Sequence, residues 1–500
     1  MDEANVDAPG GGAIPVESIV FIRESGQMGQ GRAGYAIFGL QELVAGESED
    51  AGQQQHQQQQ PRYKLLREHV PDVPQALLDQ LLVTATPEHL RSHGQQRKVQ
   101  VVVSTRSGTG LAEEFERNVL YKLLWELGLH ESKDRSKVSE GGPNADFYHL
   151  ENTSKPDSIR TLGVSLNKAV ENTVVLLSGD GGVVELLNAI ETNPPGDATN
   201  SPNTPLIAVL PLGTGNALFN SLHKKTISAS QGAVTPLVQA LRTLFRGKDA
   251  PLPCFRAEFS AGSHIVHGTD RGDSVDRLYG AIVASYGFHS QLVWESDTPE
   301  YRKHGDKRFQ MVAGELLREA HGYRAVVEFL SPAGAGSGSQ ASSITATRID
   351  RDRHAYILAT MVSNLEQTFT ISPHSRPLDN KIRLVHFGIG AGPGQGQRIM
   401  DVMMKAYDGG KHIGMRWTDD GADASNDSGQ QQKPQPAEHA VGYDEVQGAV
   451  RITIQEADAR WRKVCIDGTI VEVPEGGSMT VHRETAGRMR ILVDPAALDP

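Results

Sequence analysis

Two glycine-rich turns, each set between a buried apolar run and a helix, constrain this chain more than any other feature. The first turn spans residues 178–182 and follows the apolar run 174–177. The second spans residues 211–216 and follows the run 206–210. Turns of this kind present backbone N–H groups to phosphate at the start of a helix. The sequence therefore predicts a nucleotide site at these turns, with the carboxylate of Asp180 beside it.

The alternation of strands and helices around both turns predicts an α/β nucleotide-binding domain built on a parallel sheet. Strands are expected at residues 99–103, 147–150, 174–177 and 206–210, and helices at 111–127, 158–169, 183–190 and from 217, the last capped by Asn216. Ligands bind at the carboxyl ends of the strands in such sheets. Both glycine turns lie at those ends.

The chain divides into three predicted parts. Residues 1–95 form an accessory region, with strands at 18–23 and 34–38, a disordered glutamine-rich linker at 53–60 and helical spacing at 63–82. Residues 96–248 form the α/β domain. Residues 249–500 form a β-rich, sandwich-like domain with mobile inserts at 331–343 and 418–439. Its strands are expected at 257–259, 264–267, 281–285, 325–330, 356–360, 382–386, 449–454 and 479–482.

Charge and cysteine content exclude several classes of protein. The chain has 49 basic and 61 acidic side chains, a net charge of −12, which argues against a general nucleic-acid binder. Its two cysteines, Cys254 and Cys465, are too few for a disulfide framework or a four-cysteine zinc site. The first residues lack the apolar core of a secretory signal, and no apolar run approaches a membrane span. We therefore expect a cytoplasmic protein that reaches intracellular membranes only peripherally.

The first turn, taken alone, has two interpretations. Gly179 and Gly181 would let the backbone approach a phosphate, and Asp180 would face a cleft. The alternative is an ordinary tight turn in which Asp180 accepts a backbone hydrogen bond. A second glycine turn in the next strand–helix unit favours the phosphate site. Neither turn fits the Walker pattern or the dinucleotide fingerprint.

Together the motifs resemble the catalytic domain shared by diacylglycerol, sphingosine and ceramide kinases. The resemblance rests on SGDGGVVELLNAI (178–190), PLIAVLPLGTGNAL (205–218) and the loop STRSGTG (104–110). The segments at 285–309 and 464–469 resemble the sphingosine and ceramide kinase branch. The resemblance implies a fold like that of NAD and diacylglycerol kinases, and ATP with Mg²⁺ as cofactors.

The resemblance also implies roles for individual residues. Asp180 would be the catalytic carboxylate, Arg302 and Arg308 would reach the ATP phosphates, and Asp467 would lie near the nucleotide and metal. The remaining nucleotide-binding residues would be Arg106, Ser107, Gly108, Thr109, Gly110, Ser178, Gly179, Gly181, Gly213, Thr214, Gly215 and Asn216. Lipid-binding residues would be Phe288, Gln291, Trp294 and Glu295. The sequence does not identify the metal ligands.

Departures from the family pattern keep alternatives open. Gln291 and Val293 replace carboxylates of sphingosine and ceramide kinases, and Glu295 or Asp297 are the candidates to take their place. Thr469 stands where the family often has Glu. The leading hypothesis is an ATP-dependent kinase that phosphorylates a sphingoid base, ceramide or diacylglycerol at a membrane surface, with a homodimer allowed. The alternatives are a soluble kinase like NAD kinase and a catalytically weak lipid-binding pseudokinase.

Overall fold

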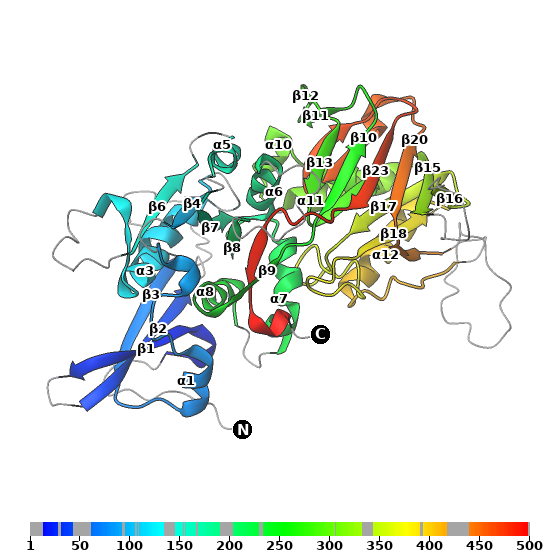
Figure 1. Ribbon diagram of the computed structural model, residues 1–500. Coiled ribbons are helices and arrows are strands. Elements are labelled where there is room, and N and C mark those ends of the chain that lie inside the picture. The colour runs from blue at the N-terminus through cyan, green and yellow to red at the C-terminus, as the bar shows by residue number, and fades with distance from the viewer. Residues whose placement is uncertain are drawn as a thin grey trace, which may run out of the picture.

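The computed structural model has two lobes, an α/β lobe that begins with the N-terminal strands and a β-rich lobe (Figure 1). It describes residues 14–28, 32–43, 62–92, 96–105, 108, 110–134, 146–153, 155, 157–166, 169–190, 204–229, 234–305, 307–332, 344–390, 394–417 and 440–498. The glutamine tract at 53–60 and the insert at 418–439 lie outside the described residues. So does the insert at 331–343, apart from its first two residues.

The first sheet has seven strands in the order β5-β6-β4-β7-β8-β24-β9. Their bounds are Arg97–Val103 (β4), Leu129–Glu131 (β5), Asp146–Asn152 (β6), Glu171–Ser178 (β7), Leu206–Pro211 (β8), Lys248–Pro251 (β9) and Arg490–Val493 (β24). The strands β5 to β8 pair in parallel, as the sequence predicts. Seven of the eight β7 residues are buried, because helices cover both faces of a parallel sheet.

Helices connect these strands. They are α2 (Ala112–Phe115), the π-helix η4 (Glu116–Leu120) and α3 (Tyr121–Glu126) after β4, then α5 (Ser158–Ser165), α6 (Asp180–Ala189), α7 (Ala217–Ala229) and α8 (Pro236–Arg246). Short 3-10 turns lie at Val16–Ser18, Glu88–Leu90, Ser132–Asp134, Ala459–Trp461 and Pro495–Ala497. The helix expected at 111–127 therefore exists, with a π-helical turn in its middle. The predicted parallel α/β domain is confirmed in its architecture.

The N-terminal region folds into a small sheet of its own. Its strands are β1 (Ile19–Met28), β2 (Arg32–Glu42) and β3 (Tyr63–Val70), followed by α1 (Gln75–Leu81). The helical prediction for 63–82 is thus wrong over its first part, where β3 pairs antiparallel with β2 along its whole length. Backbone pairing to a neighbouring strand outweighed the local apolar spacing there, as tertiary context often does.

This small sheet packs on the α/β domain. The Phe21 ring is fully buried. Its centroid lies 4.7 Å from the ring centroid of Phe38 and 5.0 Å from that of Phe245 on α8. Arg242 on the same helix donates to the Ile19 carbonyl at 2.8 Å. The accessory region therefore shares a hydrophobic core with the nucleotide-binding sheet.

The second lobe is a curved antiparallel sheet of 14 strands. They are β10 (Phe255–Phe259), β11 (His264–His267), β12 (Asp270–Ser274), β13 (Arg277–Gly280), β14 (Val283–Gly287), β15 (Tyr323–Pro332), β16 (Ile344–Arg348), β17 (Arg353–Thr360), β18 (Ile382–Gly388), β19 (Gly442–Val446), β20 (Ala449–Ile454), β21 (Lys463–Ile466), β22 (Thr469–Glu472) and β23 (Ser478–Arg483). Every strand predicted for this region is present, with bounds shifted by a few residues.

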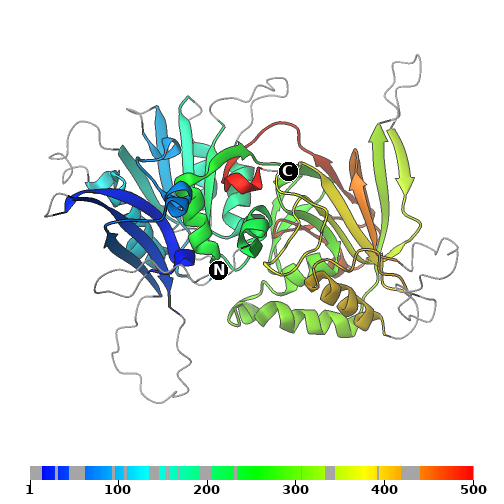
Figure 2. The ribbon, with the colours of Figure 1, turned by 90° about the horizontal axis from the view of Figure 1, so that it is seen from below.

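Four helices, which the sequence does not predict, accompany this sheet. They are α9 (Phe288–Glu295), α10 (Pro299–Arg302), α11 (Lys307–Glu319) and α12 (Gln395–Tyr407). Figure 2 shows α11 in light green and α12 in gold beneath the strands. An added Cβ at Gly396 would overlap the Leu317 carbonyl, so the start of α12 packs directly on α11.

The last strand, β24, returns from the β-rich lobe to the α/β lobe. Strand β24 follows the antiparallel sheet in sequence, yet it inserts into the seven-stranded sheet between β8 and β9. The predicted boundary at residue 249 misses this return. Helix α7 also joins the lobes, since the Ser221 hydroxyl donates to the Asn364 carbonyl at 2.9 Å and Lys224 donates to Thr370 at 2.9 Å.

Candidate active site

Three glycine-containing turns meet at the carboxyl edge of the seven-stranded sheet. An added Cβ at Gly213 would overlap the backbone of Gly179, and one at Gly179 would lie 2.6 Å from the Gly215 carbonyl oxygen. At Gly108, which has a φ of +59°, an added Cβ would overlap the Leu212 carbonyl. These positions need glycine because main chain packs against main chain there. The turns at 178–182 and 211–216 thus pack against each other, and Gly108 packs against the second of them.

Asp180 begins α6 and faces the N-terminus of the next helix. Its carboxylate accepts hydrogen bonds from the backbone N–H groups of Ala217 at 2.7 Å and Leu218 at 3.2 Å. Its own N–H donates to the Gly215 carbonyl at 3.0 Å. Burial raises the pKa of Asp180 to about 6, and the two hydrogen bonds oppose that rise. The side chain is partly exposed, so it can meet a ligand while remaining oriented by α7.

The helix cap differs from the one expected. Asn216 donates its side-chain amide to the Gly213 carbonyl at 2.8 Å, which braces the second glycine turn. The first two N–H groups of α7 bond to Asp180 instead, so the predicted cap at Asn216 is corrected to Asp180. Because these two amides are occupied by a carboxylate, a phosphate would meet other parts of the turns.

A second acid, Asp467, approaches Asp180 from the antiparallel sheet. It occupies the two-residue turn between β21 and β22, where Asp467 and Gly468 have φ values of +47° and +93°. An Asp-Gly pair is the preferred sequence for such hairpin turns. The carboxylate accepts hydrogen bonds from three successive amides, those of Ala281 at 2.6 Å, Ile282 at 3.1 Å and Val283 at 2.6 Å.

The charge of Asp180 acts on Asp467. Burial raises the pKa of Asp467 to about 7, the three amide bonds oppose the rise, and the negative charge of Asp180 adds to it. Asp467 is 8% exposed and Asp180 somewhat more. The structure therefore brings one carboxylate from each lobe close enough for their charges to interact, and the position of Asp467 near a nucleotide stays a prediction.

The other predicted nucleotide residues fall into two groups. Thr214 and Gly215 are exposed, and the space beside Gly181 and Gly110 is open, so these positions are accessible to a ligand. Ser178 is buried, and its hydroxyl donates to the Gly179 carbonyl at 3.0 Å, so only its backbone is near the turn surface. The predicted residues Arg106, Ser107 and Thr109 lie outside the described residues.

Arg302 and Arg308 meet around a single acid on the β-rich lobe. Arg302 binds Asp297 through two hydrogen bonds of 2.9 and 2.7 Å. The Arg308 guanidinium lies 3.7 Å from the same carboxylate. Asp297 is therefore engaged by two cations, although the sequence leaves it open as a lipid-binding acid. Arg302 is the more exposed of the two arginines.

The predicted lipid-binding residues on α9 are held by neighbouring groups. Gln291 is buried and donates to Glu295 at 2.6 Å, and Glu295 also pairs with Arg460 at 3.0 Å. The Trp294 indole N–H donates to the Gly268 carbonyl at 2.7 Å. Phe288 is buried in the core between α9 and the sheet. Their polar atoms are thus satisfied within the protein, and their role toward a lipid stays a prediction.

Sequence reasoning missed the amides that hold Asp467. Residues 281–283 carry no chemical signal in their side chains, because their contribution comes from the backbone alone. The Asp-Gly pair at 467–468 was a usable signal, since it predicts a hairpin turn that would project the acid. Among the described residues, no group of three or more His, Cys, Asp or Glu side chains is placed to hold a metal ion. Among the same residues, no helix has the length and apolar character to cross a membrane.

Comparison with known proteins agrees with this site. Residues 128–250, which contain Asp180 and the second glycine turn, match the diacylglycerol kinase catalytic domain. Over 233 residues the chain is 24% identical to human sphingosine kinase 2, an alignment that covers 47% of this chain. It covers 30% of the length of that relative. The resemblance to this kinase family and its sphingosine kinase branch is confirmed.

A diacylglycerol kinase from Bacillus anthracis str. Sterne superposes with a TM-score of 0.41 and 12% identity. The superposition covers 80% of this chain and 98% of the other.

Proposed function

We propose that this protein is an ATP-dependent lipid kinase that transfers the terminal phosphoryl group of ATP to a hydroxyl of a lipid. The observation that carries the proposal is the position of Asp180 at the junction of the glycine turns, with Asp467 approaching from the other lobe. The family match over residues 128–250 supports it. A sphingoid base, ceramide or diacylglycerol would be the acceptor.

In this proposal Asp180 orients the acceptor hydroxyl and takes its proton. A hydroxyl has a pKa near ~15.7, so a carboxylate with a pKa of about 6 cannot form a free alkoxide first. The difference of roughly 10 units corresponds to about 13 kcal/mol, at about 1.36 kcal/mol per unit. The proton therefore moves late, as the new bond to phosphorus forms. Positioning and charge neutralisation then supply most of the rate in such a loose transition state.

The cleft suits a nucleotide with Mg²⁺. Two carboxylates with raised pKa values lie close together, and a divalent cation would relieve their repulsion. Mg²⁺ is commonly held by one or two carboxylates together with substrate phosphates. Asp467 and Asp180 would be its protein ligands, and the metal would supply positive charge beside the phosphates. Gly181, Thr214 and Gly215 would face the phosphates with their backbone groups.

Lipid acceptance is tested with labelled ATP, Mg²⁺ and four acceptors presented separately to the wild-type protein. Sphingosine, ceramide and diacylglycerol are supplied in detergent micelles, and NAD is supplied in solution. Label in a lipid is expected. Label in NAD alone would favour the soluble-kinase alternative. The absence of both labelled product and metal-dependent ATP binding would favour a lipid-binding pseudokinase.

A further inference from the structure

A small, open pocket lies at the junction between the lobes. It is lined by Leu218, Ala281, Met361 and Arg376 among others. Leu218 donates its N–H to Asp180, and Ala281 donates its N–H to Asp467. The pocket wall therefore includes a residue bonded directly to each acid.

Arg376 contributes the charged group of this wall. The side chain is exposed, and its guanidinium has no hydrogen-bond or ion-pair partner in the part of the chain that the structure describes. Its nearest acid in sequence, Asp379, is already occupied. That carboxylate binds the Arg383 guanidinium at 2.9 Å and the Lys381 backbone N–H at 3.2 Å. Among the described residues, no acidic side chain pairs with the Arg376 guanidinium.

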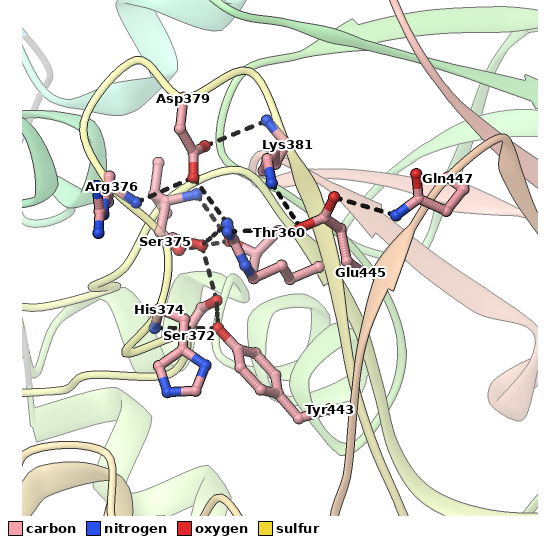
Figure 3. A network of polar contacts seen from close by, with 12 residues as sticks. Thr360, Ser372, His374, Ser375, Arg376, Asp379, Lys381, Tyr443, Glu445 and Gln447 are labelled. Atoms are coloured by element: carbon pink, nitrogen blue, oxygen red, sulfur yellow. Dashed lines mark hydrogen bonds and ion pairs between the residues drawn. The ribbon is translucent and has the colours of Figure 1, made fainter. Parts of the chain in front are cut away.

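The backbone that carries Arg376 is held firmly. The Arg376 N–H donates to Asp379 at 3.2 Å, and Arg383 also donates to the Ser375 hydroxyl at 3.1 Å. The Ser375 hydroxyl lies 2.8 Å from the Ser372 hydroxyl, which in turn lies 2.7 Å from the Tyr443 hydroxyl. Figure 3 shows this network, with the Arg376 side chain directed away from it. A braced backbone with a free cation is the arrangement that anion recognition requires.

The same loop is conformationally strained. Leu378 and Asn380 have φ values of +59° and +51°, a region that non-glycine residues rarely adopt. Among the described residues, only two others share this property, Ala320 and Asp467, and Asp467 belongs to the active-site cleft. Strain of this kind persists where the surrounding contacts enforce it and gathers at functional sites. The loop that carries Arg376 therefore contains one unfavourable backbone conformation, at Leu378.

We propose that Arg376 binds phosphate oxygens of a ligand in this pocket. A guanidinium offers paired N–H donors that match phosphate, and it stays charged at any physiological pH. The inference rests on the proposed function for its setting and adds a residue that the sequence motifs do not single out. The phosphate belongs either to the nucleotide or to a phospholipid, and the experiment separates these two sources.

The test compares Arg376→Ala with Arg376→Lys and with a control, Arg348→Ala. Arg348 is exposed on β16, and its side chain has no hydrogen-bond or ion-pair partner among the residues that the structure describes, so its removal leaves the pocket intact. Binding of ATP with Mg²⁺ is measured by calorimetry. Binding to lipid is measured by co-sedimentation with phosphatidylcholine vesicles, with and without phosphatidic acid. Neither readout needs turnover, so a failure of the proposed kinase activity is distinguished from a failure of this site.

We expect Arg376→Ala to weaken one of the two interactions about tenfold, the loss typical of a charge-assisted hydrogen bond. Weaker ATP binding assigns the site to the nucleotide, and weaker binding only to vesicles with phosphatidic acid assigns it to a phospholipid. Arg376→Lys should fall between wild type and Ala, because the charge remains but the paired donors are lost. The proposal is overturned if Arg376→Ala matches Arg348→Ala within twofold in both measurements while its melting temperature is unchanged.

Discussion

The carboxylate of Asp180 lies close enough to Asp467 for its negative charge to raise the pKa of Asp467. Asp180 follows a strand of the parallel sheet, and Asp467 sits in a hairpin of the antiparallel sheet. The pair therefore places one carboxylate from each lobe close together. Under the proposed function a nucleotide, which is itself an anion, needs cations to bind beside these two acids.

The rate should depend on pH through Asp180. Only the ionised carboxylate can accept the hydroxyl proton, and burial raises its pKa to about 6. Because kcat/KM reports the free enzyme, it should rise with pH through about 6 and fall about tenfold for each unit below that value. Initial rates between pH 5 and 8, at constant ionic strength, measure this profile. A flat profile over that range would rule out Asp180 as the base.

The free energy of unfolding should fall as the pH rises, whereas the rate should increase. Both acids have folded-state pKa values above the ordinary value of 3.8, so folding favours their protonated forms. Their stabilising contribution is complete below about pH 4 and is lost as the pH rises through about 6 and 7. For Asp180 the loss amounts to at most about 3 kcal/mol. Chemical denaturation of wild type and Asp180→Asn across pH 5 to 8 should give a shallower dependence for the variant, and equal slopes would contradict the account.

Two glycines of the turns should respond differently to alanine. Gly213→Ala places a Cβ against the backbone of Gly179, so the two turns must move apart. Both the melting temperature and the activity should fall. Gly181→Ala meets open space and lies in a helix, where alanine should be neutral or stabilising by roughly 0.4–1 kcal/mol. Thermal melts and ATP titrations distinguish them. A Gly181→Ala protein that melts normally but binds ATP less well would support nucleotide contact at that turn.

The N-terminal sheet should be required for stability. Phe21 is fully buried against Phe38 and Phe245, and replacing a buried Phe with Ala costs roughly 3–5 kcal/mol. Phe21→Ala should therefore lower the free energy of unfolding by that amount and should not change the pH profile of the remaining activity. Denaturation curves provide the measurement. A matched change on the surface, Lys64→Ala, should have little effect, because Lys64 is exposed.

The sequence predicted the parts of the fold that local patterns determine. The apolar runs at 174–177 and 206–210, with glycines after each, were sufficient to place Asp180 at a sheet edge. The strand β3 was misread, because its pairing with β2 depends on a neighbour that local spacing does not reveal. The return of β24 into the first sheet is a long-range contact of the same kind.

The site was predicted in part for similar reasons. Asp180 was predicted as a candidate from its glycine turn, and Asp467 from the resemblance of its segment to a kinase family. Two ion pairs, Asp297 with Arg302 and Glu295 with Arg460, were not predicted, because only the folded chain brings these side chains together. The lack of an ion-pair partner for Arg376 among the described residues was not predictable either, because it depends on the pairing of Asp379 with Arg383 in the folded chain.

The most direct test of the central claim compares wild type with Asp180→Asn in one assay, using labelled ATP, Mg²⁺ and the lipid that the wild type accepts. Asparagine keeps the shape and one acceptor for the α7 amides but cannot take the hydroxyl proton. We predict at least a hundredfold loss of label transfer, the usual contribution of a general base, with ATP affinity within a few-fold of wild type. Equal transfer by the two proteins would contradict the account.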